Sequence, residues 1–139
     1  MVIYFEVPGE PVAQGRPKFT RIGNHVRAYD PEKSRLYKSL VRDAAAKVMP
    51  ETPLECAVSL MVMAYRSIPR SWSKKKQESA RRGEIMPTTK PDIDNVVKAI
   101  KDALTGVIWR DDSKVVSLFA EKSYSVKPRI WVQIYYRKV

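Results

Sequence analysis

Two different apolar periodicities follow one another along this sequence, and they constrain its fold more than any other feature. From Leu54 to Met63 an apolar residue stands at every second position, which is typical of a half-buried β-strand. From Ile93 to Leu104 the apolar residues recur at the spacing of one helix face, and Gly106 supplies a stop signal. A chain with both patterns packs helices against a sheet, which predicts an α+β fold.

The remaining segments add elements of both kinds. Strands are expected at residues 2–7, 115–119 and 130–136, the last two as antiparallel neighbours. Residues 14–28 predict loops around one or two short strands, and residues 69–83 predict a loop with a short exposed helix. We therefore expect a single domain over residues 1–139, in which a mixed or antiparallel sheet of about four to five strands packs with two main helices.

The first main helix is expected to begin at Asp30-Pro31, with Asp30 as the N-cap and Pro31 at the first helical position. Pro50 predicts that this helix ends near residue 49. Its buried face is predicted by the apolar residues that recur every four positions, namely Leu36, Leu40, Ala44 and Val48.

The charge balance predicts a polyanionic partner. The chain has 26 Lys and Arg against 15 Asp and Glu, a formal net charge of +11. Such an excess favours nucleic acid first and an anionic membrane surface second. The basic residues gather in residues 14–42 and 66–82. The candidate DNA contacts are Arg16, Lys18, Arg21, Arg27, Arg70, Lys74, Lys75, Lys76, Arg81, Arg82 and Lys90.

Several classes of protein are disfavoured by what the sequence contains. One cysteine, Cys56, and one histidine, His25, make neither an internal disulfide nor a four-ligand zinc site. Gly9 to Gly15 resembles a phosphate loop, but Arg16 stands where the lysine is required, so no nucleotide cofactor is expected. No signal peptide and no bilayer-spanning run is visible, which predicts a cytoplasmic protein that does not enter a membrane.

An acidic segment interrupts the basic chain at residues 92–112, where five aspartates stand against three basic residues. Carboxylates beside a phosphate repel it, unless a divalent cation lies between them. Magnesium takes oxygen ligands of this kind. Pro91 directs Asp92 to the start of the helix and places Asp94 in its first turn, and Asp112 follows in the next turn of the chain. These residues predict a metal site.

A structural reading of the same residues stays open. Acidic residues in a first helical turn stabilise the helix dipole, and an Asp-Asp pair is common in turns. Asp94 and Lys98 have the spacing of an ordinary surface ion pair. On this reading the chain is a non-catalytic nucleic-acid-binding module.

Specific motifs surround the acidic segment. They read Lys90-Pro91-Asp92-Ile93-Asp94-Asn95, then Lys98, Asp102-Ala103-Leu104 and Trp109-Arg110-Asp111-Asp112-Ser113. Gly15-Arg16-Pro17, Pro69-Arg70-Ser71-Trp72-Ser73-Lys74-Lys75-Lys76 and Glu121-Lys122 stand elsewhere in the chain. Together these motifs resemble the RusA family of Holliday junction resolvases, and its phage and prophage members in particular.

The resemblance implies a function and a set of site residues. It implies a homodimeric, Mg²⁺-dependent endonuclease, with Mn²⁺ as a substitute, that resolves four-way DNA junctions by paired phosphodiester hydrolysis in recombination and repair. The host would be a bacterial cell, or one that carries a phage or prophage. A metal-dependent nuclease acting on flaps or RNA remains an alternative. The residues implied are Asp92, Asp94 and Asp112 as catalytic and metal-binding, Lys98 as catalytic, and Asn95 and Asp111 as supporting.

Overall fold

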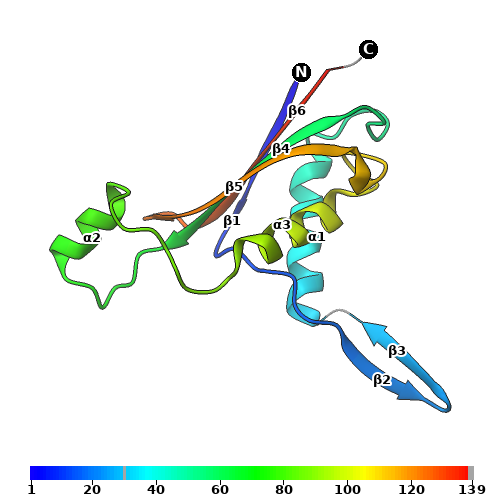
Figure 1. The fold of residues 1–139 in the computed structure, drawn as a ribbon, viewed down its shortest axis with the longest axis horizontal. Helices are drawn as coiled ribbons and strands as arrows, with labels where there is room; N and C mark the ends of the chain where they lie inside the picture. The colour runs from blue at the N-terminus through cyan, green and yellow to red at the C-terminus, as the bar shows by residue number, and fades with distance from the viewer. Residues whose placement is uncertain (30, 138–139) are drawn as a thin grey trace.

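A four-stranded mixed sheet forms the centre of the protein (Figure 1). The computed structural model describes residues 1–29 and 31–137. The strand order is β1-β6-β4-β5, in which β6 pairs antiparallel with both of its neighbours and β4 pairs parallel with β5. The strands are β1 (Val2–Pro8), β4 (Val58–Ser67), β5 (Val115–Ser125) and β6 (Arg129–Tyr136). The predicted α+β class with a mixed sheet is confirmed.

Two helices, α1 (Glu32–Ala46) and α3 (Ile93–Leu104), cover one face of this sheet (Figure 1). Alternate residues of the strands point toward the helices, and one continuous core joins the two layers. Its largest fully buried side chain is Trp109, whose indole Nε1 donates to Thr105 Oγ1 over 3.2 Å. Fully buried residues of the core include Val41, Leu60, Val62, Val96, Ile100, Ile130 and Ile134.

The buried face of α1 differs from the predicted one. Leu36 and Leu40 are 61% and 54% exposed, because α1 turns its neighbouring face toward the core. That face carries two buried polar residues. Ser34 accepts a hydrogen bond from Gly15 N, and Lys38 donates to Asp102, so both can be buried. The buried residues of α1 are Ser34, Tyr37, Lys38, Val41 and Ala45. The helix ends at Ala46 with Pro31 as its N-cap, and the predicted cap Asp30 lies outside the described residues.

The pairing of the last strands also differs from expectation. β5 and β6 are not neighbours, because β4 lies between them and pairs with both. The alternating run that begins at Leu54 becomes a strand only from Val58. Leu54 instead forms an isolated backbone bridge with Trp109, and its side chain is buried in the core, which explains why this position is apolar.

Two small elements project from the body (Figure 1). The first is a hairpin of β2 (Lys18–Ile22) and β3 (His25–Tyr29), which lies beyond the helices. The second is α2 (Lys74–Arg81), at the other end of the molecule beside β5. Both agree with the predicted short strands and short exposed helix. No helix in the described ranges is long and apolar enough to cross a membrane.

Candidate functional site

The site is built around the first turn of α3. Asp92 is the N-cap residue, with extended backbone angles of −69° and 138°, yet its side chain accepts no capping hydrogen bond. Asp94 lies in the first turn and forms no ion pair with the described side chain of Lys98. Among the described residues the capping hydrogen bond and the Asp94–Lys98 ion pair are therefore absent, whereas Asp94 does lie in the first helical turn, as the structural reading expects.

Asp94 and Asp112 line one cavity, between α3 and β5. The cavity has a volume of about 500 Å³, and Lys98 and Asp102 of α3 line it as well. Apolar side chains such as Leu118 form its other wall. Residues from two separate segments thus meet here, as the sequence predicts for Asp94, Lys98 and Asp112. Two carboxylates fit what Mg²⁺ takes from a protein, since water and phosphate oxygens complete its octahedron.

Asp92 faces a different hollow, on the opposite side of the first turn of α3. This groove, of about 700 Å³, is lined by residues 10–16, by the start of α1 and by Lys90 and Asn95. Within residues 1–29 and 31–137, no three carboxylate, imidazole or thiol groups come together closely enough to hold one metal ion. The structure therefore brings Asp94 and Asp112 together with Lys98, and it leaves Asp92 and Asn95 across the turn.

The two adjacent aspartates of the following turn have different surroundings. Asp111 Oδ1 accepts a hydrogen bond from Ser113 N over 2.9 Å and caps a short 3₁₀ helix of residues 112–114. Hydrogen bonds from the Ser113 amide and hydroxyl hold the pKa of Asp111 below its ordinary value. Asp112 lines the cavity instead. Asp111 thus shapes the turn that presents Asp112.

Two basic residues hold the loop that leads into Asp92. Arg66 Nη1 of β4 donates to the carbonyl of Lys90 and lies 3.3 Å from Thr89 Oγ1. Lys122 Nζ of β5 donates to the carbonyl of Thr89 over 2.9 Å. The sequence predicted no role for Arg66 beyond its basic segment. Lys122 belongs to the motif Glu121-Lys122, which contributes to the family resemblance, but the sequence predicted no contact for it.

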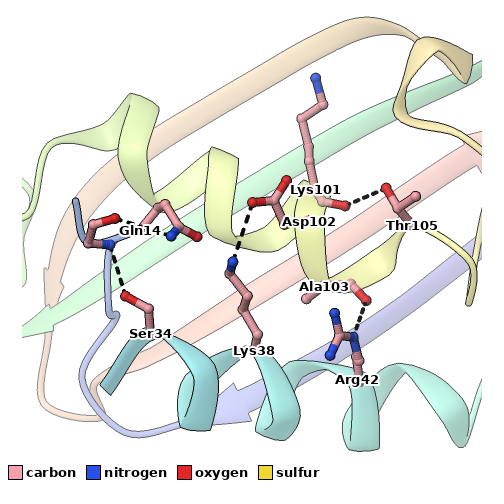
Figure 2. Close-up of polar contacts among 9 residues, drawn as sticks. Gln14, Ser34, Lys38, Arg42, Lys101, Asp102, Ala103 and Thr105 are labelled. Carbon is pink, nitrogen blue, oxygen red and sulfur yellow. Dashed lines mark hydrogen bonds and ion pairs between the residues drawn. The ribbon is translucent and has the colours of Figure 1, made fainter. Parts of the chain in front are cut away.

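Charged residues of α1 contact the C-terminal part of α3 (Figure 2). Lys38 of α1 is only 7% exposed, and its Nζ lies 3.4 Å from Asp102 Oδ2. One turn further along α1, Arg42 Nε donates to the carbonyl of Ala103 over 3.2 Å. These contacts join α1 to α3 below the cavity, and sequence analysis did not anticipate either of them.

The candidate DNA contacts fall into separate groups. Arg16 lines the groove beside Asp92, as does Lys90, and Lys18, Arg21 and Arg27 lie on the hairpin. The other candidates lie in and beside α2, at the other end of the molecule: Arg70 before the helix, Lys74, Lys75, Lys76 and Arg81 within it, and Arg82 as its C-cap.

Part of the positive charge around α2 already has partners in the protein. Arg81 pairs with Glu78, and Arg82 with Glu84, over 2.9 Å in each case. Lys76 Nζ lies 4.0 Å from the ring centre of Trp72. Trp72 in turn packs edge-on against Tyr124, with 5.3 Å between the ring centres.

Comparison with known proteins places this arrangement in a family. The family model described as endodeoxyribonuclease RusA matches residues 8–135. The uncharacterised protein YqaN of Bacillus subtilis (strain 168) is 48% identical over 134 residues, which cover 95% of this chain and 94% of that protein. The chain belongs to the RusA family of endodeoxyribonucleases.

Proposed function

We propose that this protein is a Mg²⁺-dependent endonuclease that resolves four-way DNA junctions in recombination and repair. One observation carries the proposal: Asp94, Asp112 and Lys98 come from two segments and line a single cavity. Family membership supports a deoxyribonuclease. We place the activity in the cytoplasm, where the cellular DNA of a bacterium or a phage-infected host is found.

The residues of the cavity suit phosphodiester hydrolysis. The carboxylates of the cavity would hold Mg²⁺, which would activate a water and neutralise charge on the phosphate. Asp94 and Asp112 would provide carboxylate ligands, and Asp92, the N-cap residue of α3, lies across the first turn with a side chain that accepts no capping hydrogen bond. Lys98 provides a positive charge for the phosphoryl oxygens as their negative charge grows.

A homodimer follows from the need for two cuts. Paired incision of a junction requires two copies of the site, and each chain carries one. The sheet face opposite the helices supports this proposal, because it presents apolar and aromatic side chains. Phe119 and Tyr4 are exposed there, and Met61, Met63 and Trp131 line a hollow of the same face. We propose this face as the contact between subunits.

Cleavage assays test the function. Four-way junction, flap, duplex and RNA substrates are each incubated with the protein and Mg²⁺ or Mn²⁺. We expect paired nicks in the junction, and a loss of roughly a hundredfold or more in the rate for Asp94→Asn and Asp112→Asn. Junction binding in Ca²⁺ should persist in both variants. Asp43→Asn, an exposed aspartate of α1, serves as the matched control.

Each alternative predicts a different result. Faster cleavage of flaps or RNA than of junctions identifies another nuclease. Wild-type cleavage by both site variants shows that the active site lies elsewhere. Binding without any cleavage, in either metal, supports a non-catalytic nucleic-acid-binding module.

A further inference from the structure

The β2–β3 hairpin projects from the body as a two-stranded ribbon (Figure 1). Every residue from Arg16 to Ala28 is exposed, including the apolar Phe19 at 69% and Val26 at 67%. A two-stranded hairpin with nothing packed against it is marginally stable in water. The ribbon therefore has its side chains available to a partner outside the chain.

The charge of the ribbon identifies the kind of partner. Residues 14–29 contain four basic residues and no acidic one. By the strand register, Lys18 and Arg27 lie on one face of the ribbon, and Arg21 lies on the other. A ribbon with basic side chains on both faces favours a strongly anionic partner over a basic surface. A polyanion attracts such a ribbon.

The root of the ribbon is fixed to the candidate site. Gln14 N donates to the carbonyl of Asn95 in α3 over 3.0 Å, and Gly15 N donates to Ser34 Oγ of α1 over 2.8 Å. A Cβ at Gly15 would lie 2.9 Å from the Pro31 ring, so the backbone approaches α1 as closely as only glycine allows. The groove that holds Asp92 begins at this root.

We infer that the β2–β3 hairpin is an arm that binds double-helical DNA in the major groove and sets the position of the duplex relative to the cleavage site. The major groove of undistorted B-DNA is about 12 Å wide and admits a two-stranded ribbon, whereas the minor groove, at about 6 Å, admits one only when the DNA is deformed. Lys18, Arg21 and Arg27 contact the phosphates. The inference rests on the proposed function only in taking DNA as the substrate.

Salt-dependent binding tests the arm. The arm variant Lys18→Gln/Arg21→Gln/Arg27→Gln is compared with a control variant of equal charge, Lys47→Gln/Lys127→Gln/Arg137→Gln. Binding of a four-way junction and of a plain duplex is measured in Ca²⁺ by fluorescence anisotropy at several salt concentrations. Loss of three phosphate contacts lowers the slope of log K against log salt by about 2.7 in magnitude. The control should keep a slope close to that of wild type.

A second variant tests the groove. Residues 20–27 are replaced by Asn-Gly, which shortens the arm and leaves its root in place. Guanine N7 lies in the major groove, so wild type should protect it from methylation on a junction arm, and the shortened variant should not. Melting temperature and mass by light scattering are measured for every variant.

The inference is overturned if the arm variant keeps the slope of the control, or if guanine N7 is equally exposed with wild type and the shortened variant. It is also overturned if shortening the arm halves the mass while the slope stays unchanged, because the arm is then a contact between subunits. These assays require no cleavage. A chain that binds through the arm but cuts no junction upholds the inference and refutes the proposed nuclease.

Discussion

The loop before Asp92 offers a sharp test of how the site is positioned. Arg66 and Lys122 hold this loop through the carbonyls of Lys90 and Thr89, and neither basic residue lines the cavity of Asp94. Arg66→Met and Lys122→Met remove the donors and retain much of the side-chain volume. We expect both variants to fold and to bind DNA, but to hold Asp92 less firmly.

The size of the effect follows from the contacts. A hydrogen bond from a charged donor contributes about 1.5–3 kcal/mol, and an exposed one lies at the low end of that range. At about 1.4 kcal/mol per tenfold change in rate, each substitution should lower kcat/KM by roughly tenfold. In the double variant, kcat/KM should fall by less than the product of the two single factors, because both donors hold the same loop.

Single-turnover cleavage of a four-way junction, titrated with Mg²⁺, measures this effect. We expect a higher Mg²⁺ requirement together with the lower rate, whereas the dissociation constant in Ca²⁺ should change little. Lys122→Arg should recover most of the rate, and Lys127→Met is the matched control on the adjacent turn. If both Met variants cleave like the control, the loop needs no such support. If binding weakens by the same factor as the rate, the two residues act as phosphate contacts and the reasoning fails.

Three further changes test the packing. Burial raises the pKa of Tyr37, and its hydroxyl has no hydrogen-bond partner in the described ranges. Tyr37→Phe should therefore increase the free energy of unfolding by about 1 kcal/mol in urea at pH 7. In the unfolded chain the pKa of tyrosine is about 10, and the raised pKa of the folded state favours folding only below that pH. Above it, the free energy of unfolding of wild type should fall by up to about 1.4 kcal/mol per pH unit, and Tyr37→Phe should show no such fall. Gly15→Ala should cost about 1–3 kcal/mol by the same measurement, since the new methyl group meets the Pro31 ring. Asp102→Asn should cost about 2 kcal/mol by the same measurement, because it removes the carboxylate whose Oδ2 lies 3.4 Å from the ammonium of the buried Lys38.

The sequence predicted correctly those elements whose buried face contains only apolar residues. α3 has such a stripe, and its predicted range matches the structure. α1 misleads because Lys38 and Ser34 are buried, and a periodicity of apolar residues assigns them to the surface. Strand patterns show which face is buried but not which strand lies beside it, so the place of β4 between β5 and β6 was not predictable in this way.

The same distinction applies to the site. Asp94, Lys98 and Asp112 stand out because carboxylates are unexpected in a basic chain, and the structure places all three in one cavity. The contacts of Arg66 and Lys122 join residues 24 and 33 positions apart and end on backbone carbonyls. A backbone acceptor leaves no mark in the sequence, so only the fold reveals these two residues.

The five aspartates of residues 92–112 divide according to their partners, and the division bears on the chemistry. Asp102 pairs with Lys38, and Asp111 accepts the amide of Ser113, so both are committed to the fold. Within the described residues, no N–H group donates to the side chains of the other three, Asp92, Asp94 and Asp112, and none of these carboxylates forms an ion pair. Three uncompensated carboxylates on two sides of one helical turn are unfavourable in a protein of net charge +11 that binds DNA, unless a cation joins them to the phosphate. The three carboxylates without partners in the described structure are thus the ones that the proposed metal-dependent cleavage would use.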